Sequence, residues 1–424
     1  MKIVEYPSKK DWKTLLKRPA IDHSVLEERV SAILKEVKDR GDAALIDFAQ
    51  KFDGVSVSSL IVTQKEFDEA ANLISTELKK AIEVAASNIT KFHSAQKEEE
   101  KKIETMPGVE CWRKSVAITK VGLYIPGGSA PLFSTILMLG IPANIAGCKE
   151  IVLCTPPDKA GKINPAILYT ASFLGIKKVI KAGGAQAIAA MAYGTESVPQ
   201  VYKIFGPGNQ YVTLAKQLIT SDGVAIDMPA GPSEVAVLAD ESCNPAFVAA
   251  DLLSQAEHGP DSQVLLVTTD KRVVEQVNKE LSNQLKQLPR EQVAEKALSN
   301  STAIVVKDNA EAIELLNEYS PEHLIIQTKN AEEFIGLVQN AGSVFLGHYT
   351  PEAAGDYASG TNHTLPTNSY ARAYSGVSLD SFVKKITFQK ITKEGLKTIG
   401  ATIECMAEAE QLLAHKNAVS IRIK

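Results

Sequence analysis

The chain has 424 residues, a formal net charge of −4, 45% hydrophobic residues and 23% charged residues. This is the composition of a soluble globular protein that is large enough for two or more domains. The charge balance and the lack of a long basic run exclude nucleic acid as an expected partner. No apolar run approaches the roughly eighteen residues of a membrane span, and the start of the chain lacks a signal-peptide core. We therefore expect a cytoplasmic protein without a membrane segment.

Residues 1–120 are predicted to form a mainly helical region that packs on the core. Apolar residues recur there at helical spacing, and one long amphipathic helix is expected from about Gln64 to Ser94. No chemistry is evident in this part of the chain. His93 is expected at the surface.

Alternating strands and helices are predicted after residue 120, in two regions that span 121–225 and 226–350. Repeated βα units indicate parallel sheets covered by helices on both faces. The predicted class is therefore α/β, with two incomplete Rossmann-like domains and helical appendages at both ends. Residues 351–424 are expected to supply a loop-rich segment, a strand and a final helix from about Glu394 to Ala414, with His415 just past its end.

Three loops of the first α/β region are rich in glycine, namely 126–131, 182–186 and 206–209. Ligands of parallel sheets bind beyond the carboxyl ends of the strands, and such loops let backbone approach a phosphate at a helix N-terminus. The fingerprint GxGxxG is absent, so a standard dinucleotide loop is excluded. Glycines at strand ends also serve simply to turn the chain, so the loops alone leave nucleotide binding open.

The stretch from Ile226 to Pro260 combines a proline-rich turn, an apolar strand and a helix that begins at Asn244 and Pro245. We expect that helix to run to about His258, which places Gln255 and His258 on one face. A glutamine and a histidine at this spacing are two of the ligands that a zinc ion accepts. A solvated helix end explains the same spacing, so the stretch alone does not decide between them.

Four of the seven histidines adjoin carboxylates or amides, and they supply candidate ligands for zinc without any cysteine. These are His258, His323, His363 and His415. Glu322 and His323 pair a carboxylate with a base that titrates near neutral pH. Neighbours in a regular strand point to opposite faces, so both reach one site only at a bend, for which Pro321 is suited. A junction pair exposed to water is the competing interpretation.

At this point the motifs resemble one known family, histidinol dehydrogenase. The resemblance runs from about residue 115 to the C-terminus and is carried by IDMPAGPSE, LLSQAEHGPDSQ, GLYIPGG, FGPGN, PEHL, GDYASGTNH and AHKNAV. It implies NAD⁺-dependent oxidation of L-histidinol to L-histidine through a bound aldehyde, which completes histidine biosynthesis. It also implies a homodimer whose active site is shared between subunits.

The resemblance further implies a role for particular residues. Zinc is expected to be held by Gln255, His258, Asp356 and His415, the last of them from the partner subunit's C-terminal segment. Other substrate contacts are expected from Ser233, His323, His363 and Glu410, and NAD⁺ contacts from Tyr124, Gln186 and Asn209. Glu322 is expected to activate water and His323 to act as general base.

Three alternatives remain open at the level of the sequence. One is a thiohemiacetal mechanism that uses Cys148 or Cys154, although both lie in apolar runs and the five cysteines show no CxxC spacing. A second is a zinc hydrolase in which Glu322 is the base. The third is a two-domain solute-binding protein with a cleft between its lobes.

Overall fold

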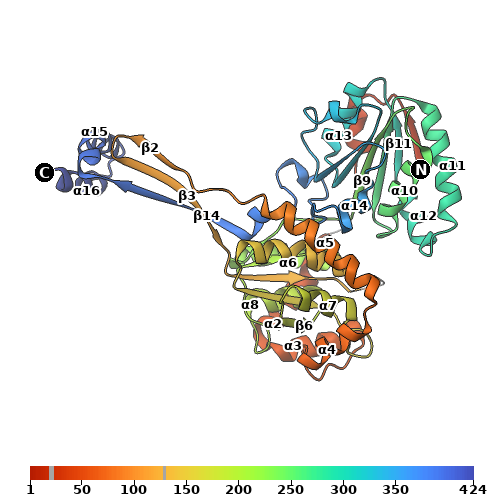
Figure 1. Ribbon diagram of the computed structural model, residues 1–424, viewed down its shortest axis with the longest axis horizontal. Helices are drawn as coiled ribbons and strands as arrows, with labels where there is room; N and C mark the ends of the chain where they lie inside the picture. Colours follow the sequence, from red (N-terminus) through yellow and green to blue (C-terminus); the bar gives the residue numbers. More distant parts are fainter. Residues whose placement is uncertain (19–22, 128–129) are drawn as a thin grey trace.

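The computed structural model describes residues 1–18, 23–127 and 130–424, so part of the predicted loop 126–131 lies outside the described residues. Two α/β lobes lie side by side, and a long thin arm that carries the C-terminus extends away from them (Figure 1). The predicted class, α/β with two parallel sheets, is confirmed.

The first lobe is built on a five-stranded parallel sheet with the order β6-β5-β4-β7-β8. Read from β4, this order corresponds to the first five strands of a dinucleotide-binding fold. Its strands are β4 (Lys120–Tyr124), β5 (Glu150–Thr155), β6 (Lys178–Lys181), β7 (Lys203–Phe205) and β8 (Ala225–Ile226). The helices that connect them are α6 (Phe133–Ala146), α7 (Pro165–Phe173), α8 (Gly184–Tyr193) and α9 (Gln210–Ile219).

Four helices from the N-terminal part of the chain cover this lobe: α2 (His23–Arg40), α3 (Asp42–Phe48), α4 (Gln64–Leu73) and α5 (Thr76–Ser94). α2 packs on α8 and α9, α4 on α7, and α5 on α6. The single helix expected over 64–94 is in fact two, because Ile74 is extended and the Ser75 hydroxyl caps a new helix at Leu78 N. The expectation that His93 lies at the surface is wrong, since its side chain is fully buried.

The second lobe contains a six-stranded parallel sheet with the order β1-β11-β10-β9-β12-β13. Apart from β1, the order repeats that of the first sheet, so the two halves share a layout. The strands are β1 (Lys2–Glu5), β9 (Glu234–Ala239), β10 (Gln263–Thr268), β11 (Thr302–Val305), β12 (His323–Gln327) and β13 (Ser343–Leu346). The α-helices of this lobe, among the described residues, are α1 (Lys9–Leu15), α10 (Pro245–Ala256), α11 (Lys271–Leu285), α12 (Glu291–Ser299), α13 (Asn309–Tyr319) and α14 (Glu352–Tyr357).

The region 1–120, predicted as helical, also contains three strands. β1 pairs in parallel with β11 and forms the edge of the second lobe's sheet. β2 (Lys102–Met106) and β3 (Val109–Ala117) form an antiparallel sheet with β14 (Val383–Ile391), in the order β14-β3-β2. This sheet is the arm, and it pairs residues 109–117 with residues 383–391, which lie far away in the sequence.

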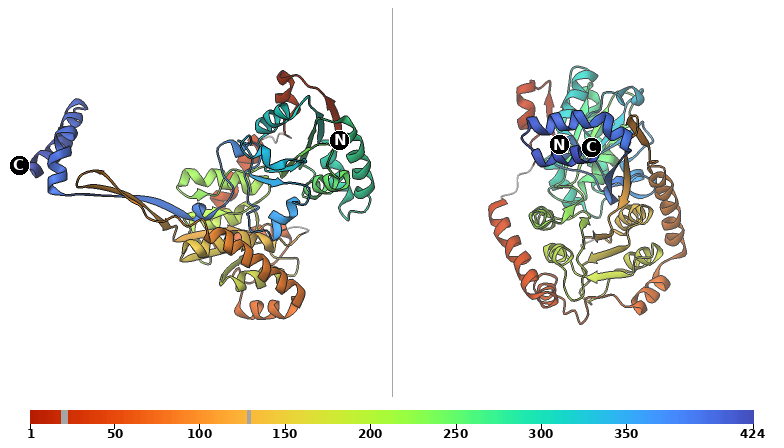
Figure 2. Two further views of the ribbon diagram at one scale, coloured as in Figure 1. Left: turned by 45° about the horizontal axis from the view of Figure 1, so that its top comes forward. Right: turned by 90° about the vertical axis from the view of Figure 1, so that its left-hand side faces the viewer.

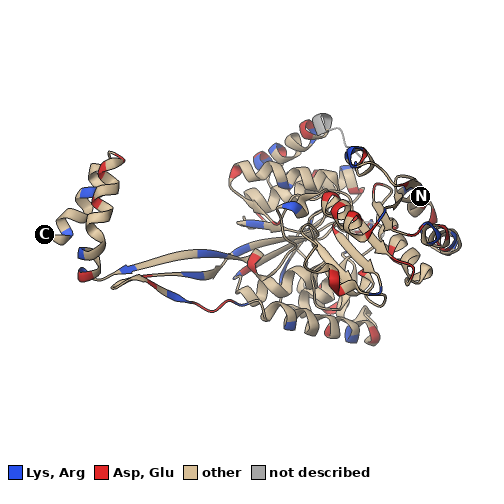
Figure 3. Ribbon diagram, turned by 90° about the horizontal axis from the view of Figure 1, so that it is seen from above, with Lys and Arg blue, Asp and Glu red and all other residues tan. Residues whose placement is uncertain are grey.

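Two helices, α15 (Lys393–Ala409) and α16 (Leu413–Ile423), form the tip of the arm (Figure 2). The single final helix expected over 394–414 is therefore interrupted, and His415 lies inside α16 rather than beyond the last helix. Acidic and basic side chains are interspersed over the lobes and the arm (Figure 3). Within the described parts of the chain, no helix is both long and apolar enough to cross a bilayer.

Candidate active site and cofactor cavity

A bend in the backbone brings Glu322 and His323 into one buried site. Ser320 adopts a left-handed conformation with φ of 55°, Pro321 follows, and His323 is the first residue of β12. The exposed fractions of Glu322 and His323 are 7% and 3%. The competing interpretation of a water-exposed pair is therefore wrong.

Both side chains are bonded to the backbone of Glu234, the first residue of β9. The Glu234 N–H donates to Glu322 Oε2 at 2.9 Å, and His323 Nδ1 lies 3.1 Å from the Glu234 carbonyl oxygen. A carbonyl only accepts, so Nδ1 carries the hydrogen and Nε2 is the nitrogen left to act as a base. His323 Nε2 has no hydrogen-bond partner among the described residues.

Three carboxylates surround the His323 ring. Its Nδ1 lies 3.7 Å from Glu322 Oε2 and 3.8 Å from Glu352 Oε1, and its Nε2 lies 3.5 Å from Asp356 Oδ1. Burial alone would lower the pKa of His323, but the charges of Glu352, Glu322 and Asp356 outweigh burial and raise the pKa. Glu352 was missed in the sequence, although it lies four residues before Asp356 and therefore on the same face of α14.

Burial also shifts the acids of this cluster. It raises the pKa of Glu322 and the pKa of Glu352 to about 8 each, because the charged carboxylate is poorly solvated there. The pKa of Asp251, which accepts a hydrogen bond from Gln327 Nε2 at 2.6 Å, is raised to about 7 for the same reason. The cluster can therefore exchange protons near neutral pH.

The predicted zinc ligands Gln255, His258 and Asp356 gather around this cluster. Gln255 is 1% exposed on α10, and its side-chain amide lies beside the carboxylates of Glu322 and Glu352. His258 lies in the turn after α10 rather than on the helix, because the helix ends at Ala256. Burial opposes ionisation of Asp356, but its pKa is nevertheless lowered, first by His323 and then by the charges of His363 and His258.

His363 connects the two lobes. Its Nδ1 donates to the Asp356 carbonyl at 2.8 Å, and its Nε2 lies 3.0 Å from the hydroxyl of Thr135 on α6. Ser233 directly precedes Glu234 and is half-buried. These two predicted substrate contacts therefore lie next to the cluster.

Glu410 and His415 do not join the cluster within one chain. Glu410 ends α15 and His415 lies on α16, both exposed, at the far end of the arm (Figures 1 and 2). One chain thus brings together three of the four predicted zinc ligands.

The three predicted NAD⁺ contacts, Tyr124, Gln186 and Asn209, line a single cavity of about 1520 Å³ in the first lobe. The cavity lies at the carboxyl ends of β4 and β5, where the strand order reverses between β4 and β7. Gly206 is required at this point, because a Cβ there would lie 2.1 Å from the Tyr124 carbonyl oxygen. The Tyr124 hydroxyl accepts a hydrogen bond from Gly184 N at 3.0 Å, and burial raises the pKa of Tyr124 to about 12.

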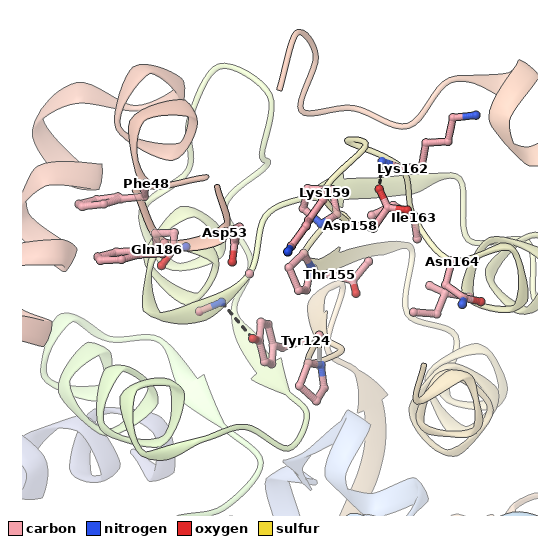
Figure 4. A pocket seen from close by; sticks show the side chains of 18 of the residues that line it. Phe48, Asp53, Tyr124, Thr155, Asp158, Lys159, Lys162, Ile163, Asn164 and Gln186 are labelled. Carbon is pink, nitrogen blue, oxygen red and sulfur yellow. Dashed lines mark hydrogen bonds between the residues drawn. The ribbon is translucent and has the colours of Figure 1, made fainter. Parts of the chain in front are cut away.

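The opposite wall of the cavity is supplied by N-terminal helices in which the sequence indicated no chemistry. Side chains from that wall, such as Phe48 and Asp53, face the same space as Tyr124 and Gln186 (Figure 4). The acid–base cluster, by contrast, lies at the amino ends of β9 and β12. The first sheet thus faces its cavity with the carboxyl ends of its strands, whereas the second sheet faces the acid–base cluster with the amino ends of its strands.

The cysteines are poorly suited to nucleophilic chemistry. All five are free, and burial raises the pKa of Cys148 to about 11 and the pKa of Cys154 still further. Thiolate formation near neutral pH is therefore disfavoured in both, which argues against the thiohemiacetal alternative.

The fold and the site together define an α/β enzyme with a cofactor-sized cavity in one lobe and a buried acid–base cluster in the other. The model of the histidinol dehydrogenase family matches residues 16–423. The chain belongs to this family and is an oxidoreductase of histidine biosynthesis. Family membership excludes the hydrolase and solute-binding alternatives.

Related proteins match over 93% or more of their length. The chain is 62% identical to histidinol dehydrogenase from Bacteroides thetaiotaomicron over 423 residues, which covers 100% of this chain and 99% of the relative. It is 55% identical to the enzyme from Aliivibrio fischeri, with 97% and 93% covered. The crystal structure of histidinol dehydrogenase from Elizabethkingia anophelis superimposes with a TM-score of 0.98 at 57% identity, with 100% and 98% covered.

Proposed function

We propose that this protein oxidises L-histidinol to L-histidine in two successive NAD⁺-dependent steps, with L-histidinaldehyde kept bound between them. The observation that carries the proposal is the Glu322–His323 pair, buried together against one backbone residue in a chain of this family. We also propose the cytoplasm as its location, which stays a prediction from the sequence.

NAD⁺ is the proposed occupant of the first lobe's cavity. The cavity lies at the strand-order reversal, where α/β sheets bind dinucleotides, and the N-terminus of α8 opens into it at Gly183 and Gly184. Tyr124, Gln186 and Asn209 are the proposed contacts.

In the first oxidation, His323 Nε2 takes the proton of the alcohol while hydride passes from the carbinol carbon to the nicotinamide. One NAD⁺ is reduced and the alcohol becomes an aldehyde. The bond from His323 Nδ1 to the Glu234 carbonyl keeps the basic nitrogen directed at the substrate. His363 and Ser233 are the proposed substrate contacts beside it.

An aldehyde must be hydrated before it can give up a second hydride. We assign Glu322 as the base that takes a proton from the attacking water, for which a pKa of about 8 is well matched to neutral pH. As water adds, protonated His323 returns its proton to the aldehyde oxygen, which completes the gem-diol and leaves His323 neutral again. His323 then accepts a proton from the gem-diol as the second hydride leaves. The products are the carboxylic acid and a second NADH.

Zn²⁺ is the proposed metal, and the residues present fit it. Gln255, His258 and Asp356 supply nitrogen and oxygen donors, and the surrounding buried carboxylates of Glu322 and Glu352 favour a cation. When bound, zinc would serve as a template that orients the imidazole and amine of histidinol.

The fourth ligand, His415, and the substrate contact Glu410 are proposed to come from a second copy of the chain. The arm and its tip expose apolar side chains that are suited to cover by a partner, namely Ile386, Phe388, Ile391, Met406, Leu413 and Ile421. A homodimer with exchanged arms would complete each site.

One assay tests the reaction. Metal-replete protein is given L-histidinol and excess NAD⁺, and NADH and histidine are both quantified. We expect about two NADH per histidine, because the oxidation removes four electrons. One NADH with free aldehyde, or no NADH, contradicts the proposal.

A further inference from the structure

The backbone of Glu234 is hydrogen-bonded to both proposed catalytic side chains. Its N–H binds Glu322 and its carbonyl binds His323, at 2.9 and 3.1 Å. The two groups lie on the same residue, so any displacement of Glu234 displaces both catalytic side chains.

The side chain of Glu234 is anchored by Arg18 from the N-terminal segment. Arg18 Nε lies 2.5 Å from Glu234 Oε1, and Arg18 Nη2 lies 2.7 Å from Glu234 Oε2. Asn368 N donates to Oε1 at 2.8 Å. The two charged side chains are only 12% and 2% exposed. This two-bond, buried contact fixes the orientation of the carboxylate as well as its position.

Arg18 also binds the chain on the other side of the site. Its Nη2 donates to the Tyr319 carbonyl at 2.8 Å, and its guanidinium stacks 4.1 Å from the centre of the Tyr319 ring. Its Nη1 donates to Ser369 Oγ at 2.7 Å, and that hydroxyl in turn donates to the Tyr319 carbonyl at 3.1 Å. Tyr319 ends α13 and directly precedes the bend at Ser320 that leads to Glu322.

We propose that Arg18 is a positioning residue for the two proposed catalytic side chains. The Arg18 guanidinium binds Glu234, whose backbone is hydrogen-bonded to both side chains. It also binds Tyr319, which directly precedes the bend that leads to Glu322 and His323. Within the described residues, Arg18 makes no hydrogen bond to Glu322 or His323 itself. The inference rests on the proposed function, because it assigns Arg18 a role in those two oxidations.

The test compares Arg18→Ala and Arg18→Lys with the wild-type protein, below the onset of unfolding of each. We expect kcat to fall about 100-fold in Arg18→Ala, the loss associated with displacement of catalytic groups by about 1 Å, while KM for L-histidinol changes less than threefold. Arg18→Lys keeps the positive charge but cannot make the two parallel hydrogen bonds of a guanidinium to the Glu234 carboxylate, so an intermediate kcat is expected. Added guanidinium at millimolar concentration should restore part of the activity of Arg18→Ala and none to Arg18→Lys.

Arg272→Ala is the matched control, since Arg272 also pairs with an acid, Asp270, but is 79% exposed. We expect it to behave as wild type. If Arg18→Ala does not fold, Arg18→Lys decides the question. A kcat within twofold of wild type in a folded Arg18 variant, or a loss confined to KM, overturns the inference. A wild-type protein that makes no NADH from L-histidinol instead overturns the proposed function.

Discussion

Replacement of Glu322 by glutamine tests whether the two proposed catalytic residues, Glu322 and His323, serve different steps of the reaction. Glutamine keeps an oxygen that accepts the Glu234 N–H, so the backbone contact at 2.9 Å survives. What is lost is a base with a pKa of about 8. A positioned general base contributes about 10²- to 10⁴-fold, so the hydration and oxidation of the aldehyde should slow by at least about 100-fold.

The alcohol step should be affected far less by Glu322→Gln. Glu322 is one of three carboxylates around His323, at 3.7 Å, and Glu352 and Asp356 remain at 3.8 and 3.5 Å. The base for the alcohol proton thus keeps most of its electrostatic environment. We expect this step to slow by about tenfold or less.

The assay is NADH formation in single turnovers, started either from L-histidinol or from L-histidinaldehyde. Glu332→Gln, at an exposed position, is the matched control and should leave both steps unchanged. Equal losses in the two steps, or a larger loss in the alcohol step, would refute the assignment of Glu322 as the base that activates water.

Three further predictions concern the shared site, the cavity and the buried acids. When His415→Ala and Glu322→Gln chains are unfolded and reassembled together in equal amounts, about a quarter of wild-type activity should return. Half of the dimers are then mixed, and one of the two sites in each mixed dimer is intact. No gain in activity would refute exchange of the arms. Tyr124→Phe removes one hydrogen bond to Gly184, so KM for NAD⁺ should rise about three- to tenfold while KM for L-histidinol is unchanged, and an unchanged KM for NAD⁺ would contradict this. Glu322 and Glu352 have folded-state pKa values raised to about 8 from 4.5, so the folded state retains protons that the unfolded chain has released. The free energy of unfolding of the metal-free protein should therefore fall as the pH rises from about 4.5 to about 8. Urea unfolding of Glu352→Gln should show a smaller fall over the same range. A free energy of unfolding that rises with pH would exclude this explanation.

Local patterns in the sequence were sufficient for the fold class and for the candidate pair of Glu322 and His323. Alternating strands and helices predicted the two parallel sheets, because hydrophobic periodicity and glycine-rich turns are local properties. The bend at Pro321 allowed Glu322 and His323 to share a site, and the structure places both side chains there. The residues assigned to zinc and to NAD⁺ came from the family resemblance, and their roles stay predictions.

Tertiary structure alone decided the contacts that join distant parts of the chain. The pairing of β3 with β14 and the addition of β1 to the second sheet depend on partners far away in the sequence, which no local period encodes. The burial of His93 and the anchoring of Glu234 by Arg18 likewise arise between segments that the sequence leaves unconnected. The fourth predicted zinc ligand, His415, lies on α16 at the end of the arm, so a single chain does not bring it to the other three predicted ligands.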